Sequence, residues 1–230
     1  MRIAAPFAGI EAWIFDLDNT LYPTGATIYG RIGARMTAYV ARATGLDLAA
    51  ALELQEDYYH RYGATLAGLI QHHGVDGRDF LDDVHDVDLD CVPPDPDLAG
   101  LIARLPGRRI VFTNGARDYA ERMTARLGMR EMFDLHFDIE AAGFSPKPER
   151  AAFERLIAHA RLDPRRCVFF EDSPRNLETA HALGFQTVLV HEAGAAPDPA
   201  PAHIHHAAGC LKTFLRRQVL TAPPSHETAA

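Results

Sequence analysis

Short apolar runs that end abruptly in polar residues limit the fold of this chain more than any other feature. One run covers residues 12–15 and ends at Asp16, and others cover residues 110–112, 167–170 and 187–190. Uninterrupted apolar runs of this length are typical of strands that are buried on both faces of a parallel sheet. We therefore predict that the four runs are strands of one such sheet.

Helical patterns separate most of these runs. Apolar residues recur at intervals of three and four residues in segments 98–105, 153–157 and 177–183, and the last segment precedes Gly184, a residue type that often ends helices. Strands that alternate with helices predict an α/β fold with a doubly wound parallel sheet.

The stretch after the first run shows helical patterns and no convincing strand. An apolar stripe at helical spacing runs from Ile28 to Val40, and further helical segments are predicted at about 48–72 and 76–84. The simplest interpretation is a helical cap inserted after the first strand, with the proline-rich segment 91–96 as the return linker.

These patterns divide the chain into two predicted domains. The α/β core covers residues 1–23 and 93–218, and the helical cap covers residues 24–92. The last residues, which end in TAPPSHETAA, have little apolar content. We therefore expect residues 219–230 to form a disordered tail.

The charge balance bears on the partners of the protein. Lys and Arg total 23 and Asp and Glu total 31, which gives a net charge of −8, and there is no basic run. Because long nucleic acids are bound largely through neutralisation of their phosphates, we expect no such partner. A small phosphate ester needs only one or two local cations and stays open as a ligand. The oligomeric state is left open.

Several features indicate a cytoplasmic enzyme. No stretch of about 18 apolar residues occurs, so we expect no membrane-spanning helix and no membrane partner. The first residues lack the basic start and the cleavage site of a signal peptide. The three cysteines are far apart and form no CxxC, so neither a disulfide framework nor a cysteine zinc site is indicated.

Two acids follow the first predicted strand. Asp16 and Asp18 are two residues apart, so their carboxylates can point the same way at the carboxyl end of the strand, where α/β sheets bind ligands. Two close carboxylates repel unless a cation or a shared proton lies between them, and Mg²⁺ suits such a pair. A polar turn at the end of a strand is the plainer interpretation of the same residues.

Polar residues also follow two later strands or lie on a stiff loop. Thr113 and Asn114 end the run at 110–112, where a threonine can cap the next helix or help to hold an anion. Lys147 lies between two prolines and could neutralise a phosphoryl group. Glu171 and Asp172 end the run at 167–170, where one of them could bind a metal or cap a helix.

The four groups converge on one pattern. The segment Phe15–Tyr22 (FDLDNTLY), followed in order by Thr113, Lys147 and the acid pair 171–172, resembles the four motifs of the haloacid dehalogenase superfamily of phosphohydrolases. The resemblance spans about residues 12–192, and the helical insertion is similar to the cap of subfamily I.

The resemblance implies a role for each motif residue. Asp16 would be the nucleophile that forms an aspartyl-phosphate, and Asp18 would be the general acid and base. Thr113 and Asn114 would bind the phosphate together with Lys147, which would also stabilise the charge of the transition state. Mg²⁺ would be held by Asp16, the backbone carbonyl of Asp18, and Asp172. Glu171 would act from the outer shell of the metal.

The second acid and the cap help to choose among reactions of the superfamily. Dehalogenating relatives lack the acid at the position of Asp18, so dehalogenation is not expected. Phosphonate-cleaving relatives need a lysine in the cap, and residues 24–92 contain none. Sugar-phosphate mutases keep all four motifs and stay an alternative.

The sequences of the motifs resemble those of the pyrimidine 5′-nucleotidase branch most. The segments 16–23 (DLDNTLYP), 171–176 (EDSPRN) and 62–69 (YGATLAGL) carry this resemblance. It implies that a nucleoside monophosphate such as UMP or CMP is the substrate. A phosphatase or phosphomutase that acts on a sugar phosphate or another small ester is the alternative.

Two further groups of residues have less specific patterns. In the run Tyr58–Tyr62 (YYHRY), aromatic rings and an arginine could contact a base, but neighbouring residues of a helix point in different directions. His203, His205 and His206 could suggest a metal site, but we interpret them as a polar lead into a C-terminal helix. A non-catalytic phosphate-binding regulator on the same fold also stays open.

Overall fold

A six-stranded parallel sheet forms the centre of the molecule. The computed structural model describes residues 2–23, 27–191 and 199–221. All neighbouring strands of the sheet are parallel, in the order β4-β3-β2-β5-β6-β7. The strands are β2 (Ala12–Phe15), β3 (Arg108–Phe112), β4 (Leu135–Phe137), β5 (Cys167–Glu171), β6 (Gln186–Val190) and β7 (His206–Ala208).

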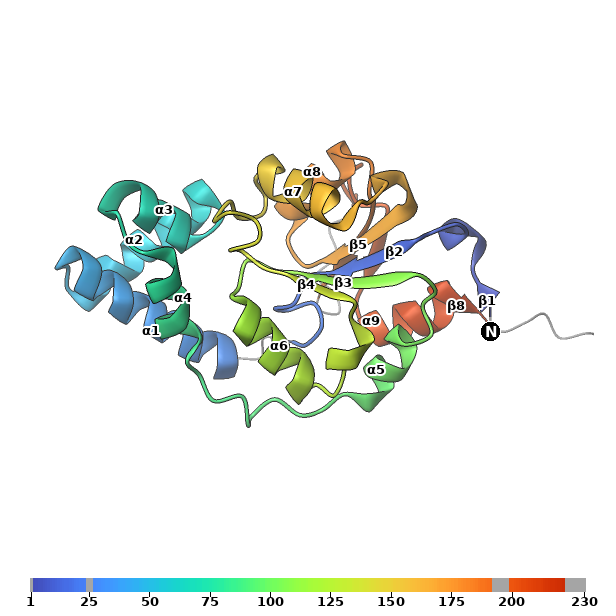
Figure 1. Ribbon diagram of the computed structural model, residues 1–230, viewed down its shortest axis with the longest axis horizontal. Coiled ribbons are helices and arrows are strands. Elements are labelled where there is room, and N and C mark those ends of the chain that lie inside the picture. The colour runs from blue at the N-terminus through green and yellow to red at the C-terminus, as the bar shows by residue number, and fades with distance from the viewer. Residues whose placement is uncertain (1, 24–26, 192–198, 222–230) are drawn as a thin grey trace, which may run out of the picture.

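Helices cover both faces of this sheet, which confirms the predicted doubly wound fold. Helices α7 and α8 lie on one side, and α5, α6 and α9 lie on the other (Figure 1). Their bounds are α5 (Pro96–Ile102), α6 (Arg117–Arg126), α7 (Arg150–Ala160), α8 (Pro174–Ala182) and α9 (Leu211–Phe214), the last continued by a π-helical segment, Leu215–Val219.

The central strand β2 shows why the apolar runs lack alternation. Trp13 and Phe15 pack into one hydrophobic cluster, whereas Ile14 packs into a second cluster on the opposite face. All three side chains are fully buried. Successive strand residues point to opposite faces, so a strand covered by helices on both sides needs apolar residues at every position.

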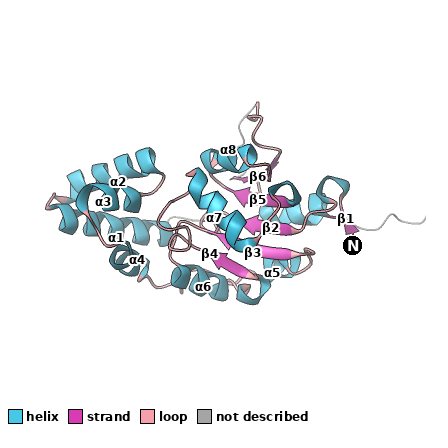
Figure 2. Cartoon of the chain, turned by 45° about the horizontal axis from the view of Figure 1, so that its top comes forward, coloured by secondary structure: helices cyan, strands magenta, loops and turns pink. Residues whose placement is uncertain are grey.

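Four helices between β2 and β3 form the cap that the sequence predicts. They lie together beyond one end of the sheet (Figures 1 and 2). The first and second are the longest, and all four are consecutive in the chain: α1 (Thr27–Thr44), α2 (Leu48–Tyr62), α3 (Thr65–His73) and α4 (Gly77–His85). The division into a core at 1–23 and 93–218 and a cap at 24–92 stays a prediction for the domain boundaries themselves.

The predicted helix at 48–72 is two helices, because Gly63 interrupts it. Gly63 has a φ of +79°, the left-handed conformation that glycine adopts at little cost, and it ends α2. A Cβ atom at this position would lie 2.6 Å from the carbonyl oxygen of Lys147 and 2.6 Å from Cδ of Pro148. The turn between α2 and α3 therefore contacts the loop that carries Lys147.

The structure corrects the prediction for the end of the chain. Val219 and Leu220 are buried, and β8 (Leu220–Thr221) pairs in antiparallel fashion with β1 (Arg2–Ile3). The disordered tail was therefore wrongly extended to residues 219–221, and residues 222–230 lie outside the described part. A pair of two-residue strands is too short to leave a recognisable pattern.

Two strands of the main sheet were missed for a similar reason. The strands β4 and β7 have three residues each and contain a histidine. His206 belongs to β7, and the Nδ1 atom of His205 accepts a hydrogen bond from the backbone N–H of Thr187 at 3.0 Å. These histidines therefore hold the edge of the sheet rather than only leading into the helix. None of the helices in the described segments is long and apolar enough to cross a bilayer.

Candidate active site

The predicted site residues meet at the carboxyl ends of three adjacent strands. Asp16 follows β2, Thr113 follows β3, and Glu171 ends β5. The backbone N–H of Asp16 bonds to the carbonyl of Phe170 at 2.9 Å, which extends the pairing of β2 and β5 by one residue. Because neighbouring parallel strands end at the same edge, side chains far apart in the chain face one crevice.

Lys147 lies at the centre of this group and is buried. Its Nζ atom donates to Oδ1 of Asp16 at 2.6 Å, to Oε2 of Glu171 at 2.8 Å and to the carbonyl of Phe112 at 2.9 Å. Only 2% of the residue is exposed. All three ammonium hydrogens therefore have acceptors, and the buried cation is balanced by two carboxylates.

Asn114 fixes the loop that carries this lysine. Its Nδ2 donates to the carbonyl of Lys147 at 3.0 Å, and its Oδ1 accepts from the backbone N–H of Lys147 at 2.8 Å. The side-chain amide predicted to bind phosphate is thus already paired with protein backbone. The Oγ1 atom of Thr113 accepts from the N–H of Gly115 at 2.9 Å, a local turn contact that leaves the hydroxyl hydrogen available.

Burial controls the ionisation of the acids. Burial raises the pKa of Asp16 to about 7, and the negative charge of Glu171 adds to this effect while Lys147 opposes it. Burial likewise raises the pKa of Glu171 to about 7, and Lys147 again opposes the change. Burial alone would lower the pKa of Lys147, but the carboxylates of Asp16 and Glu171 outweigh it and raise that pKa. The lysine therefore stays charged.

Three carboxylates form a group that could hold a divalent cation. One oxygen each from Asp16, Glu171 and Asp172 lies within 4.8 Å of the others. Asp172 also accepts a hydrogen bond from Nδ2 of Asn19 at 2.8 Å. Mg²⁺ takes oxygen ligands and is usually held by one or two carboxylates, so Asp16 and Asp172 of this group fit the predicted ion. Glu171, predicted in the outer shell, lies within this group.

Asp18 is not part of that group, and its side chain contacts two tyrosines. Its Oδ1 atom accepts hydrogen bonds from the hydroxyl of Tyr22 and, at 2.9 Å, from that of Tyr119. The two hydroxyl oxygens are 2.7 Å apart. Burial raises the pKa of Asp18, and the two hydroxyls oppose this rise. The two tyrosines thus fix one carboxylate oxygen of Asp18, and this position is compatible with proton transfer.

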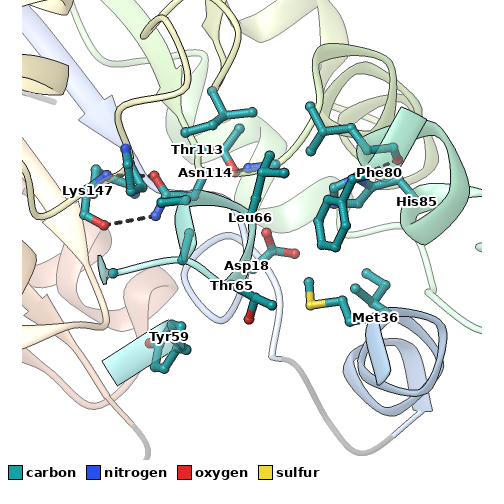
Figure 3. Close-up of a pocket in the computed structure, with 18 of the residues that line it drawn as sticks. Asp18, Met36, Tyr59, Thr65, Leu66, Phe80, His85, Thr113, Asn114 and Lys147 are labelled. Carbon is teal, nitrogen blue, oxygen red and sulfur yellow. Dashed lines mark hydrogen bonds between the residues drawn. The ribbon is translucent and has the colours of Figure 1, made fainter. Parts of the chain in front are cut away.

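A cavity of about 540 Å³ opens over these residues, and the cap forms its far wall (Figure 3). Asp18, Thr113 and Lys147 line the core side. Aliphatic and aromatic side chains line most of the cap side, among them Ile32, Met36, Leu66 and Phe80, with Gln55, Glu56, Thr65 and His85 as polar members. A ligand of the core residues would therefore be enclosed between core and cap.

Of the aromatic run 58–62, one residue lines this cavity. Tyr59 does so, whereas the hydroxyls of Tyr58 and Tyr62 pair with His73 and His72 elsewhere on the cap. The expected divergence of neighbouring helical residues is therefore observed. Tyr119 and His85 line or support the site and were not predicted, because neither occurs in a motif or at a strand end.

The chain belongs to the haloacid dehalogenase-like hydrolases, since the model of that family matches residues 10–184. Among curated proteins, it is 27% identical over 206 residues to phosphate metabolism protein 8 of Saccharomyces cerevisiae, covering 82% of this chain and 64% of that protein. It is 27% identical over 229 residues to enolase-phosphatase E1 of Nocardia farcinica, covering 84% of this chain and 91% of the relative. The chain thus spans less than two thirds of the yeast protein.

Solved structures share the fold at low sequence identity. A haloacid dehalogenase-type phosphatase of Thermococcus onnurineus matches with a TM-score of 0.60 and 16% identity, over 90% of this chain and 96% of that one. L-2-haloacid dehalogenase of Xanthobacter autotrophicus matches with a TM-score of 0.55 and 18% identity, over 90% and 97%. At this identity the neighbours establish the α/β fold and do not distinguish the two reactions.

Proposed function

We propose that this protein hydrolyses phosphate monoesters through an aspartyl-phosphate on Asp16. One observation carries the proposal: Asp16, Asp18 and the buried Lys147 line one cavity, and Asp16 belongs to a group of three carboxylates that also contacts this lysine. A lone nucleophile would not need the second acid, which is absent from dehalogenating relatives. The enolase-phosphatase among the relatives is consistent with phosphate chemistry.

The proposed reaction has two steps. A carboxylate oxygen of Asp16 bonds to phosphorus while the ester P–O bond breaks, and Asp18 gives its proton to the leaving oxygen. Asp18 then takes a proton from a water molecule, whose oxygen bonds to phosphorus and releases Asp16 and inorganic phosphate. The raised pKa of Asp18 favours the protonated form that the first step needs.

The other residues position the phosphoryl group and balance its charge. Lys147 would face the equatorial oxygens, and Thr113 would donate its free hydroxyl hydrogen to one of them, with Asn114 fixing the lysine loop. Mg²⁺, held by Asp16, Asp172 and the backbone carbonyl of Asp18, would supply charge neutralisation between the acids and the phosphate. Glu171 would orient Lys147 from outside the metal.

For the substrate we propose a pyrimidine nucleoside monophosphate such as UMP or CMP. A cavity of about 540 Å³ is within the range that binds small organic ligands, and aromatic side chains such as Tyr59 and Phe80 offer faces for a base. Lys147 is the only lysine or arginine among the described residues that line it, so a second anionic group on the substrate would have no cation to pair with.

The test is a steady-state assay with a panel of phosphate esters in Mg²⁺. We expect UMP and CMP to have the highest kcat/KM, and Asp16→Asn to abolish phosphate release with an unchanged circular dichroism spectrum. Equal slow rates on all esters would remove the nucleotidase assignment, and a higher kcat/KM for sugar phosphates would replace it. Binding without turnover would indicate a regulator, and halide release from a 2-haloacid would indicate a dehalogenase.

We also infer that the reaction takes place in a reducing compartment such as the cytoplasm. All three cysteines are free thiols in the folded protein, and Cys91 and Cys210 are exposed. Exposed thiols persist where the surroundings keep them reduced.

A further inference from the structure

His85 is a buried polar side chain of the cap that lies beside the candidate active site. It is the last residue of α4 and is 7% exposed. It lines the same cavity as Asp18 and Thr113 (Figure 3). Its Nε2 atom lies 3.5 Å from the position that a Cβ would occupy on Gly115, in the turn that follows β3. A cap residue thus faces the phosphate-binding turn of the core.

Two contacts hold the imidazole of His85, and a third holds its backbone. Nδ1 lies 3.1 Å from the carbonyl oxygen of Leu81, and the ring stacks on Tyr119 with centroids 4.6 Å apart and an interplanar angle of 29°. The backbone carbonyl of His85 accepts a hydrogen bond from Arg122 at 2.6 Å. A ring that swung out of this position would lose its contacts with Leu81 and Tyr119.

The contact with Leu81 decides which nitrogen carries the proton. A carbonyl oxygen only accepts, so Nδ1 must be the donor. Burial lowers the pKa of His85 to about 4, and the nearby charge of Arg122 acts in the same direction. The neutral ring then has an unprotonated Nε2, which accepts hydrogen bonds and has no hydrogen-bond partner within the described segments.

We propose that His85 is a specificity-determining residue whose Nε2 accepts a hydrogen bond from a hydroxyl or N–H group on the organic part of the substrate. The surrounding wall is largely apolar, with Phe80 and Leu81 from the same helix. When a substrate fills the cavity, an acceptor that is left without a donor is costly, so an ester that lacks such a donor is disfavoured. The inference rests on the proposed phosphatase function and narrows its substrates to esters of hydroxylated or N–H-bearing alcohols.

The test compares two substrates in two enzymes. UMP carries donors on both ribose and base, whereas phenyl phosphate carries none on its organic part. The quantity measured is kcat/KM for UMP divided by kcat/KM for phenyl phosphate. We expect His85→Phe, which keeps a ring against Tyr119, to lower this ratio about three- to tenfold, the value of one hydrogen bond. His72→Phe, the same change at an exposed cap residue, should leave the ratio unaltered.

A second variant and two substrate analogues sharpen the comparison. His85→Gln places an amide oxygen near the former Nε2, so its ratio of kcat/KM values should be closer to that of the wild type than the ratio of His85→Phe is. UMP methylated at the base N–H and UMP without the ribose hydroxyls identify which group donates to His85. The substitution His85→Phe should lower kcat/KM less for the analogue that lacks this donor. For a sugar phosphate, ribose 5-phosphate against its 2-deoxy form serves the same purpose.

The outcomes separate this inference from the proposed function. If the wild-type protein hydrolyses no phosphate ester, the proposed function fails. If it hydrolyses them but His85→Phe leaves the ratio unchanged, or His85→Gln lowers it as much as His85→Phe does, the role of His85 is refuted. If His85→Phe does not fold, the test uses the kcat/KM ratio of His85→Gln and the kcat/KM values of the wild type on UMP and the two analogues. Equal wild-type values on UMP and both analogues would refute the role of His85.

Discussion

The buried imidazole of His85 makes a specific prediction for the pH dependence of stability. Its pKa is lowered by burial to about 4 in the folded protein, from an ordinary value of 6.5. Between these values the unfolded chain binds more protons at this residue, so the free energy of unfolding rises with pH in this window. The contribution of the neutral His85 to the free energy of unfolding is complete above pH 6.5 and is lost as the pH falls toward 4.

The size of this effect follows from the two pKa values. A difference between 6.5 and about 4, at 1.36 kcal/mol for each pH unit, amounts to about 3 kcal/mol. This is a large part of the stability of an ordinary domain, which is about 5–15 kcal/mol. Removal of the titrating group should therefore change the pH profile visibly.

The assay is urea unfolding of the wild type and of His85→Phe at several pH values from about 7 down to about 4.5. Other acids titrate in the same range, but they are shared and cancel in the difference between the two proteins. We expect the variant to gain stability relative to the wild type as the pH falls, by about 2–3 kcal/mol over the range. His85→Gln should show the same slope, because it removes the same proton site. Parallel wild-type and variant profiles would refute a buried neutral imidazole.

Three further predictions concern the supports of the site and of the fold. Tyr119→Phe removes a hydroxyl that donates a hydrogen bond to Asp18 at 2.9 Å. The kcat for phosphate esters should therefore fall about tenfold or more, with a smaller change in KM. An unchanged kcat would show that this hydrogen bond does not assist Asp18. Gly63→Ala would place a Cβ atom 2.6 Å from the carbonyl oxygen of Lys147, at a left-handed φ. Urea unfolding should therefore show a free energy of unfolding lower by at least about 1 kcal/mol, and the rate of phosphate release should drop. An unchanged free energy of unfolding would mean that the turn moves freely. Leu220→Ala truncates a residue that is 2% exposed, so we expect the free energy of unfolding to fall by about 2–5 kcal/mol in the same assay. A fall below about 0.5 kcal/mol, the usual range for surface substitutions, would show that packing of Leu220 does not stabilise the fold.

The strands that build the site were readable from the sequence because they are central. β2 and β5 are buried on both faces, so each is an uninterrupted apolar run that ends in an acid. The edge strand β7 has three residues and one covered side, and β1 and β8 have two residues each. Short edge strands carry too few buried positions to make a pattern, which is why they were missed.

The sequence by itself determined the chemistry available to this protein. Asp16, Asp18, Lys147 and the acids at 171–172 were identified at strand ends and on a stiff loop, and parallel strands necessarily bring their ends to one edge. This part of the site depends on local pattern and topology alone, so it does not require knowledge of side-chain packing.

Only the tertiary structure decided how these groups are divided. Asp18 accepts from Tyr22 and Tyr119, whereas Asp16 shares Lys147 with Glu171, and no spacing in the chain encodes that difference. The cap wall and the free nitrogen of His85 are likewise absent from any motif. They arise because burial and packing between distant helices set hydrogen-bond partners and ionisation, and those depend on the folded arrangement rather than on neighbouring residues.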